Sequence, residues 1–320
     1  MLHIETPLVP SPHMSKLADR PVYLKLENLQ VPGSFKIRGI GLTCQEAQKS
    51  GFTKLVGSSG GNAGLAMAYA ANQLEMPLTL FIPKSTPQMM VDLIQAQEVE
   101  VRIIGENWNQ ANEAAQEFLK SNQEAFFVHP YDQESTWRGH ASMVPEIKSQ
   151  LQSLGVKNLP EAIITCVGGG GLAIGLLKGM QDCDWNTKVP LIAMETEGSN
   201  CFHEALKAKK IVNLESINSI AKSLGALSVS EELLKMALSQ DFKVQSHIVS
   251  DRDALSACLD FAKYHRMLVE PACGAALSAV FNQSDDTLPK NGFGPIIMVV
   301  CGGNIASLEL FDGWKKQLNI

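Results

Sequence analysis

The chain has 320 residues, is 45% hydrophobic and carries a formal net charge of −6. A chain of this size can bury a core large enough for two domains. The negative charge and the lack of a long basic segment argue against nucleic acid and anionic membranes as partners.

The cysteines and the first residues of the chain indicate a cytoplasmic location. The seven cysteines are scattered and form no CxxC pair, which argues against a disulfide framework and a zinc site. The N-terminal residues lack the basic and apolar regions of a signal peptide, and no apolar run reaches membrane-spanning length. We therefore expect a protein of the reducing cytoplasm with no membrane partner.

From residue 22 onward, short apolar strands are predicted to alternate with helices. In the first series, strands are expected at residues 22–27, 54–57, 78–82, 99–104 and 125–128, and helices at 35–50, 62–74, 87–97 and 108–122. After a helix at 142–154, the second series has strands at 162–167, 191–195 and 296–301, and helices at 172–181, 200–209, 231–240, 251–263, 271–281 and 308–318. This alternation predicts an α/β protein with two open, mostly parallel sheets flanked by helices. Ligands of such folds bind at the carboxyl ends of strands.

Two cations stand at the predicted start of the helix over residues 35–50. Ser34 is a favourable N-cap residue, so Lys36 and Arg38 would lie in the first turn, at the positive end of the helix dipole. We expect this position to lower the pKa of Lys36. A neutral lysine can attack a carbonyl and form a Schiff base. A solvated lysine is the ordinary alternative, and the other motifs decide between the two.

Residues 57–64 read Gly-Ser-Ser-Gly-Gly-Asn-Ala-Gly and connect a predicted strand to an Ala-rich helix. Glycines let backbone N–H groups crowd together, and a helix N-terminus adds partial positive charge. With the Ser59 hydroxyl and the Asn62 amide, this loop favours binding of a carboxylate or phosphate. A tight turn without a ligand is the alternative.

A run of four glycines at residues 168–171 follows the strand that ends at residue 167. Consecutive glycines expose their backbone amides, which together make a nest for an anion. A flexible linker is the alternative, but a linker is not expected between an apolar strand and an apolar helix. Two further strand-end loops, residues 195–198 and 301–304, contain Glu195 and Cys301. A cysteine at such a position is commonly a core residue, and residues 195–198 alone would be a polar turn.

Together these motifs resemble the fold-type II family of pyridoxal-phosphate (PLP) enzymes, with a tryptophan synthase β-like fold, and within it the L-serine/L-threonine dehydratases. The resemblance runs over almost the whole chain and is carried by residues 34–39, 58–64, 139–142, 168–171, 193–196, 269–276 and 301–303. It implies a large cofactor-binding domain formed by residues 1–34 and 136–320, and a small substrate-side domain formed by residues 35–135.

The resemblance implies an activity, which is α,β-elimination of L-serine to pyruvate and ammonia, and of L-threonine to 2-oxobutyrate and ammonia. A serine racemase-like enzyme or another β-eliminating PLP enzyme is the alternative within the family. Ala63 favours the catabolic dehydratases, because racemases and biosynthetic deaminases more often have histidine there. Gly60 replaces an alanine of some dehydratases and is expected to widen the substrate pocket.

The resemblance also implies roles for individual residues. Lys36 would hold the cofactor covalently and serve as general base, Phe35 would stack on the pyridine ring, and Cys301 would face the ring nitrogen. The cofactor phosphate would bind to Gly168, Gly169, Gly170 and Gly171, and Asn62 would bind the 3′ oxygen. The substrate carboxylate would bind to Ser59 and its loop, in which the substrate-side residues are Ser59, Gly60, Asn62 and Ala63. A neutral Cys301 thiol, in place of an aspartate, would favour prompt elimination over transamination.

A monovalent cation, usually potassium, is a further implication of the resemblance, and relatives are commonly homodimers. The matching cation-binding positions are Gly168, Glu195, Ser199, Cys201, Leu224 and Ala226. Relatives have serine at the position of Cys201, and a thiol is a poor ligand for a hard cation. The cation is therefore expected to be held mainly by carbonyl oxygens.

Three classes of protein outside this family compete with the interpretation. Residues 57–61 match the GxSxG elbow of hydrolases, but a hydrolase would give Lys36 no role. Residues 168–173 match GxGxxA, with Glu195 placed like a ribose-binding acid of a nicotinamide-dependent dehydrogenase, although that motif normally opens the first βα unit. A non-enzymatic amino-acid sensor on the same fold is the third, and the presence of both Lys36 and Ser59 argues against it.

The remaining candidate residues favour structural roles. His129 and His140 lie near the junction of the two series of strands, and residues 251–253 are predicted to cap a helix with a solvated face. Trp108 and Trp137 are expected to anchor packing. No His/Cys/Asp cluster has the spacing of a transition-metal site.

Overall fold

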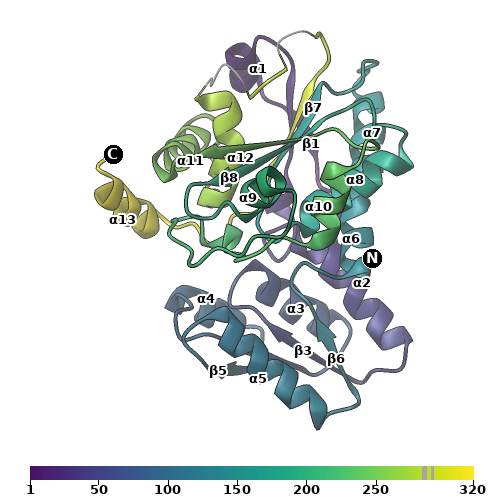
Figure 1. Ribbon diagram of the computed structural model, residues 1–320, viewed down its shortest axis with the longest axis vertical. Coiled ribbons are helices and arrows are strands. Elements are labelled where there is room, and N and C mark those ends of the chain that lie inside the picture. The colour runs from purple at the N-terminus through teal and green to yellow at the C-terminus, as the bar shows by residue number, and fades with distance from the viewer. Residues whose placement is uncertain (283–286, 290–291) are drawn as a thin grey trace. The chain divides into compact units, whose positions relative to one another are not determined.

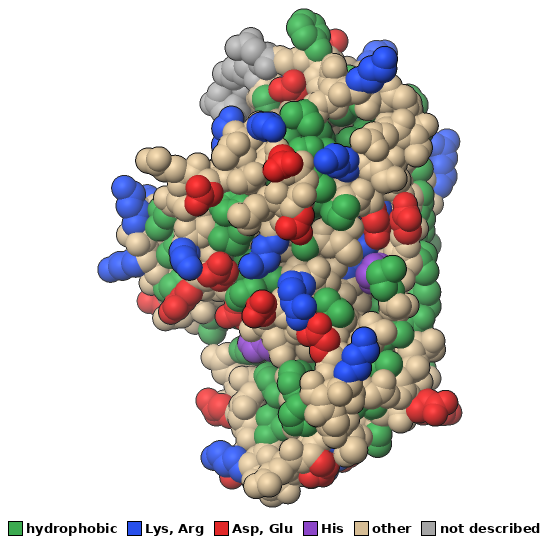
Figure 2. Space-filling model, turned by 90° about the vertical axis from the view of Figure 1, so that its right-hand side faces the viewer, with side chains coloured by type: hydrophobic (Ala, Val, Ile, Leu, Met, Phe, Trp, Pro, Cys, Tyr) green, Lys and Arg blue, Asp and Glu red, His purple; other side chains and the backbone are tan. Residues whose placement is uncertain are grey.

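The computed structural model describes residues 1–282, 287–289 and 292–320, and its contacts divide the chain into two compact units. Unit 1 contains Met1–Ile4 and Gln30–His140, and unit 2 contains Glu5–Leu29 and Ala141–Ile320. Among the described residues, no helix is both long and apolar enough to cross a membrane. On the face shown in Figure 2, acidic and basic side chains are interspersed.

Unit 1 is built on a four-stranded sheet whose strands are all parallel, in the order β5-β4-β3-β6. Its elements are α2 (Lys36–Lys49), β3 (Lys54–Ser58), α3 (Asn62–Gln73), β4 (Leu78–Ile82), α4 (Gln88–Gln95), β5 (Glu100–Ile103), α5 (Trp108–Lys120) and β6 (Ala125–Val128). Helix α6 (Glu134–Ala141) ends where unit 2 begins. The central strand β3 pairs Leu55 with Leu78 on one side and with Phe126 on the other.

Unit 2 is built on a six-stranded sheet in the order β1-β2-β10-β7-β8-β9, in which β1 alone is antiparallel to its neighbour. The strands are β1 (Leu8–Pro10), β2 (Val22–Lys25), β7 (Ala162–Cys166), β8 (Leu191–Thr196), β9 (Val244–Val249) and β10 (Ile296–Val299). The helices are α1 (Pro12–Ala18), η1 (Glu27–Leu29), α7 (Met143–Ser153), α8 (Gly171–Asp182), α9 (Cys201–Ala208), η2 (Lys222–Leu224), α10 (Glu231–Leu238), α11 (Asp251–His265), α12 (Pro271–Phe281) and α13 (Leu308–Leu318).

The predicted alternation of strands and helices is confirmed, mostly within one to three residues at each end. The prediction missed β9, whose residues Val244–Val249 are only partly buried and include Gln245, Ser246 and His247. It also missed β1, which has three residues, and the short helices α1 and α6. Polar or very short elements give a weak periodic signal, because periodicity reports which face is buried.

The core of unit 2 lies between the six-stranded sheet and α12. Helix α12 (Pro271–Phe281) consists mainly of small, apolar residues on all of its sides, and ten of its residues are buried. Such a helix can be surrounded by protein; α12 contacts β7, β8, β10 and α11, and Figure 1 shows α11 and α12 side by side. The consequence for function is that β7 and β10 are held as rigid neighbours, so the loops that follow them start from fixed positions.

A buried charge ties β2 to α7 within unit 2. The Lys25 side chain is 0% exposed, and its Nζ donates hydrogen bonds to Glu146 Oε2 at 2.7 Å, Thr6 O at 2.7 Å and Gln150 Oε1 at 3.1 Å. Burying an ammonium is costly unless counter-charges and acceptors surround it. The network therefore fixes α7 against the edge of the sheet that contains β2.

We predict that Glu146→Gln lowers the free energy of unfolding by about 3 kcal/mol, because it removes a counter-charge from a fully buried ammonium. Gln150→Ala is the comparison variant, since it removes a neutral acceptor from the same ammonium, together with the bonds from Gln150 Nε2 to Glu5 Oε1 and Thr6 O. It should cost about 1–2 kcal/mol, because it removes neutral bonds and leaves the ion pair in place. Urea unfolding followed by tryptophan fluorescence measures both. Equal small losses in the two variants would contradict the assigned role of the ion pair.

Candidate active site

Lys36 is the first residue of α2, and its amine is held by the backbone of a neighbouring loop. Its Nζ donates a hydrogen bond to the carbonyl oxygen of Pro130 at 2.7 Å and lies 5.3 Å from the centre of the Phe35 ring. The side chain is half-buried. The Lys36 amine is thus placed beside the Pro130 carbonyl and near the Phe35 ring.

The helix N-cap differs from the prediction, which placed it at Ser34. Phe35 is the N-cap residue, already in the helical region at φ −54° and ψ −20°, and no side chain caps the helix. Ser34 lies one residue too early to reach the first free N–H groups of α2. Its hydroxyl is buried and has no hydrogen-bond partner in the part of the chain that the structure describes. A polar group left in this state beside Lys36 fits a site that receives a polar ligand.

Further cationic or titratable groups lie near Lys36. Arg38 is fully buried, and so is His140, whose ring centre lies 5.0 Å from that of Phe35. Burial, followed by the charges of Lys36, Arg38 and His3, lowers the pKa of His140 well below its usual value. His140 is therefore neutral at pH 7. Both of its ring nitrogens lack a hydrogen-bond partner among the described residues.

The loop between β3 and α3 contains the predicted substrate-side residues. Ser59 Oγ accepts a hydrogen bond from the N–H of Gly61 at 3.3 Å, which is the N-cap residue of α3. Ser59 and Gly60 are half-buried, whereas Asn62 and Ala63 are buried in the first turn of α3. Since α3 packs against α2, the helices that begin at Asn62 and Lys36 are neighbours in unit 1.

Two residues of α5 that the sequence left without a role at the site hold the end of β3. Trp108 Nε1 donates a hydrogen bond to the carbonyl oxygen of Ser58 at 2.7 Å, and the Ser58 hydroxyl donates to Asn112 Oδ1 at 2.9 Å. These bonds fix the residue immediately before Ser59. The predicted packing role of Trp108 is thus extended to positioning the loop. Nothing in the sequence marks Asn112, because the pairing joins residues 54 positions apart.

In unit 2, Gly168, Gly169, Gly170 and Gly171 form a tetraglycine loop between β7 and α8. Gly170 is the N-cap residue of α8 and has φ +98°, a conformation that other residues rarely adopt. A side chain at Gly168 would stand 3.0 Å from Leu224 Cα. Among the described residues, none of the four amide groups donates a hydrogen bond within the protein. Free amides at the start of a 12-residue helix fit a bound phosphate.

Cys301 follows β10, which is the parallel neighbour of β7. Its sulfur lies 3.4 Å from Cys166 Sγ, at the end of β7, and 3.3 Å from Cys273 Sγ. Contact with these two thiols, together with burial, raises the pKa of Cys301 well above its usual value. Cys301 is therefore a neutral thiol, and it lies at the same edge of the sheet as the tetraglycine loop.

Several of the predicted cation-binding positions also come together in unit 2. The Cys201 thiol lies 3.6 Å from the carbonyl oxygen of Gly168, as a hydrogen-bond donor, and the Ser199 hydroxyl donates to the carbonyl oxygen of Leu224 at 2.9 Å. Glu195 is fully buried and accepts hydrogen bonds from the N–H groups of Phe202 and His203. Burial outweighs these bonds and raises the pKa of Glu195 to about 8. Ala226 donates its N–H to the carbonyl oxygen of Leu224 at 2.7 Å.

The predicted site residues thus form two sets, one in each unit. The set in unit 1 contains Phe35, Lys36, Ser59, Gly60, Asn62 and Ala63. The set in unit 2 contains the tetraglycine loop, Cys301 and the six predicted cation-binding positions, which share Gly168 with that loop. The set in unit 1 contains an amine with hydroxyl and amide groups. The set in unit 2 contains backbone amides that could bind an anion, together with a neutral thiol.

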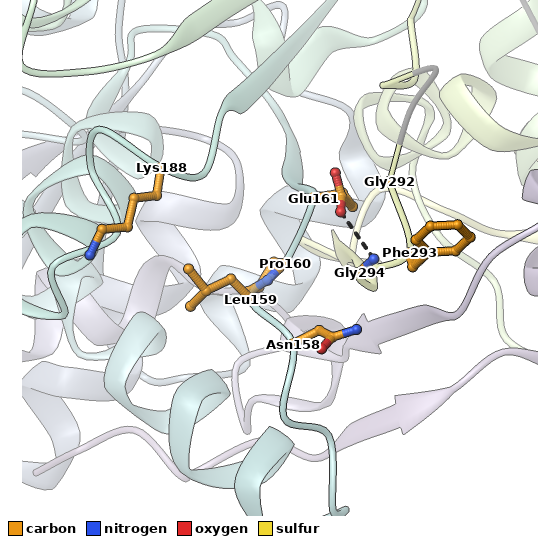
Figure 3. A pocket seen from close by; sticks show the side chains of 8 residues that line it. All are labelled: Asn158, Leu159, Pro160, Glu161, Lys188, Gly292, Phe293 and Gly294. Atoms are coloured by element: carbon orange, nitrogen blue, oxygen red, sulfur yellow. Dashed lines mark hydrogen bonds between the residues drawn. The ribbon is translucent and has the colours of Figure 1, made fainter.

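A surface pocket of about 530 Å³ elsewhere in unit 2 contains none of these residues. Its carboxylate, that of Glu161, accepts a hydrogen bond from the N–H of Gly294 at 3.0 Å, and Lys188 extends away from it (Figure 3). The Phe293 ring is 92% exposed. The pocket therefore has no converging polar groups and is not the active-site candidate.

Comparison with known proteins agrees with the chemistry of both sets. A family model described as "Pyridoxal-phosphate dependent enzyme" matches residues 1–302. A human "Serine dehydratase-like" protein is 45% identical over 99% of this chain and 95% of its own length. The human "L-serine dehydratase/L-threonine deaminase" is 40% identical over 100% of this chain and 96% of its own length. A crystal structure of a fungal L-serine ammonia-lyase from Rhizomucor miehei superposes with a TM-score of 0.89 at 35% identity, covering 99% of each chain.

The chain therefore belongs to the family of pyridoxal-phosphate dependent enzymes. Its fold is that of fold-type II members, as the motifs predicted. This membership overturns the hydrolase and nicotinamide-dehydrogenase interpretations, because the family model and the relatives that match almost the whole chain belong to neither class. The residues present also fit the cofactor, since a lysine amine, amides without a partner among the described residues and a neutral thiol are suited to its aldehyde, phosphate and ring nitrogen.

His129 gives the loop that holds Lys36 a pH dependence. Its Nδ1 accepts hydrogen bonds from the N–H groups of Asp132 at 2.8 Å and Tyr131 at 3.3 Å, which requires an unprotonated nitrogen. Burial is the main cause that lowers the pKa of His129 to about 4, with a smaller contribution from the charge of Lys36. The stabilisation from neutral His129 is thus complete above its unfolded pKa near 6.5 and is lost as the pH falls through about 4.

We predict that His129→Asn flattens the pH dependence of stability between pH 6.5 and 4, because asparagine offers an acceptor in place of Nδ1 and does not titrate. The difference in unfolding free energy between wild type and variant should change by on the order of 1–3 kcal/mol across this window. Urea unfolding at several pH values measures it. Parallel pH profiles for the two proteins would contradict the assignment.

Proposed function

We propose that this protein catalyses α,β-elimination of L-serine to pyruvate and ammonia, and of L-threonine to 2-oxobutyrate and ammonia. The observation that carries the proposal is the presence in one chain of the Lys36 amine and a tetraglycine loop with free amides. The choice of substrate rests on the names of the human relatives and of the fungal ammonia-lyase.

Each residue of unit 1 has a task in this reaction. The Ser59 hydroxyl and the backbone amides of its loop would bind the substrate carboxylate, which orients the α-carbon. The Lys36 amine, once released, removes the α-proton as general base. For this step the amine must be neutral, and its place at the start of α2 is expected to disfavour the ammonium form. Asn62 would hold the 3′ oxygen of the cofactor, and Phe35 would lie against its ring.

The residues of unit 2 would bind the phosphate and the ring nitrogen of the cofactor. Gly168, Gly169, Gly170 and Gly171 would hold the phosphate of the cofactor through their amides. Bound PLP supplies the electron sink for the pair left behind when the α-proton departs. Cys301, as a neutral thiol, would offer the ring nitrogen a weak hydrogen bond without supplying a charge. Departure of the β-hydroxyl is then favoured over transfer of the amino group.

We further propose a monovalent cation, usually potassium in relatives, beside the tetraglycine loop. Support comes from the carbonyl oxygens of Gly168 and Leu224, which are contacted by Cys201 and Ser199, and from the buried carboxyl of Glu195. Activity in potassium chloride would exceed that in tetramethylammonium chloride. Equal rates in the two salts would contradict a cation site.

Two finer points of the proposal concern assembly and location. The resemblance to the dehydratases leads us to propose a homodimer, for which light scattering should give a mass of about twice that of one chain. A cytoplasmic location is supported by seven buried cysteines that are all free, since thiols persist in a reducing compartment.

We predict that the purified, PLP-supplied protein releases pyruvate from L-serine, and that Lys36→Ala lowers kcat by at least about 10²-fold, because general-base catalysis contributes about 10²–10⁴-fold. Ser59→Ala should instead act mainly on KM for L-serine. A coupled lactate dehydrogenase assay with L-serine, L-threonine and D-serine measures these effects. Racemisation of L-serine without pyruvate release would favour the racemase alternative and contradict the proposal.

A further inference from the structure

Asp251, the first residue of α11, is bound to a segment 31 residues earlier in the chain. Its Oδ1 accepts a hydrogen bond from the Ser219 hydroxyl at 2.6 Å, and its Oδ2 accepts one from the N–H of Ile220 at 2.9 Å. The prediction had placed this aspartate in a helix cap with a solvated face. The cap is Ser250, whose side chain accepts from the N–H of Asp253, so the Asp251 carboxylate is used for another purpose.

Ser219 connects Asp251 to Thr196 and to the residues that follow Ser219 in the segment. It is 4% exposed, and while its hydroxyl donates to Asp251, its oxygen accepts from the N–H of Ala221 at 2.9 Å and from the Thr196 hydroxyl at 2.8 Å. Thr196 is the last residue of β8. The carboxylate, the two hydroxyls and the two backbone amides thus form one largely buried network that joins α11, the end of β8 and the start of the 219–226 loop.

The 219–226 loop packs against the tetraglycine loop. It continues as the short helix η2, which ends at Leu224, and the backbone of Leu224 faces Gly168 so closely that a side chain at Gly168 would stand 3.0 Å from its Cα. The Leu224 carbonyl oxygen also accepts the Ser199 hydroxyl at 2.9 Å. A shift of the 219–226 loop would therefore move the surface on which the tetraglycine loop rests.

We propose that Asp251 is a positioning residue for the cofactor phosphate: its carboxylate fixes the 219–226 loop, which in turn holds the tetraglycine loop in its phosphate-binding conformation. This inference rests on the proposed function, because it takes the tetraglycine loop to be the phosphate site. The effect would reach the cofactor through the 219–226 loop, since among the described residues no hydrogen bond joins Asp251 to any of the four glycines. It resembles the way in which outer-shell groups orient the ligands of metal sites.

The test compares two aspartates on the same turn of α11. Asp251→Ala removes both bonds to the 219–226 loop, whereas Asp253→Ala removes a carboxylate that bonds with the Ser250 hydroxyl at 2.7 Å and serves as the matched control. Both variants lose a negative charge at the same helix N-terminus, so their general effect on α11 is similar. Full-length protein stripped of cofactor is titrated with PLP and, separately, with pyridoxal, which has the same aldehyde but no phosphate.

Asp251→Ala should weaken PLP binding on the order of tenfold, the size typical of outer-shell changes, and should leave pyridoxal binding within about twofold of wild type. Asp253→Ala should change neither. Thermal midpoints of the cofactor-free proteins separate a general loss of stability from this selective effect. If Asp251→Ala does not fold, Asp251→Asn and Ser219→Ala each remove part of the network and should show the same selective loss to a smaller extent.

Equal weakening of PLP and pyridoxal, or equal effects of the two aspartate variants, would show a purely structural role and overturn the inference. Wild-type protein that bound no PLP would contradict the proposed function itself, and the inference with it. Wild-type protein that binds PLP tightly, together with an Asp251→Ala variant that binds it equally well, would overturn the inference alone.

Discussion

The constraint on which this structure depends is that the first amide groups of a helix have no partner inside the helix. In unit 2 the tetraglycine loop brings such amides together after β7, and glycine at all four positions leaves them uncovered. In unit 1 the same end of α2 is occupied by a lysine. One helix start therefore favours an anion, and the other carries the amine that we propose to react with the cofactor. A phosphate-bearing aldehyde is a ligand that satisfies both.

The parallel sheets turn this local property into a site. Because β7 and β10 are adjacent and run in the same direction, the loops after them emerge at one edge, and Cys301 comes within 3.4 Å of Cys166. The close packing of α12 behind these strands keeps the edge rigid. In unit 1 the corresponding work is done by Trp108 and Asn112, which hold the end of β3 just before the Ser59 loop. In both units, the packed strands thus fix the positions at which the loops with the predicted site residues begin.

Much of this could be predicted from the sequence, because the informative residues are glycines, a lysine and a cysteine at the ends of apolar strands. Local patterns reveal them without knowledge of distant contacts. The roles of Asp251 and Asn112 could not be predicted, because their partners lie far away in the chain. The role of the Pro130 carbonyl could not be predicted either, because every residue carries a carbonyl. Ser34 was wrongly placed as the N-cap, since a favourable residue type does not settle at which residue a helix begins. Strand β9 was missed because half of its side chains are polar.

The central claim is that the Lys36 amine captures the aldehyde of the cofactor, and chemical trapping tests it most directly. Sodium borohydride reduces the bond between a lysine and a bound aldehyde, so the purified, PLP-supplied protein can be reduced, digested and analysed by mass spectrometry. The account predicts one dominant pyridoxyl-modified peptide, with the modification on Lys36 and a loss of the visible absorption band. Modification of another lysine, or no modification after full cofactor loading, would contradict it.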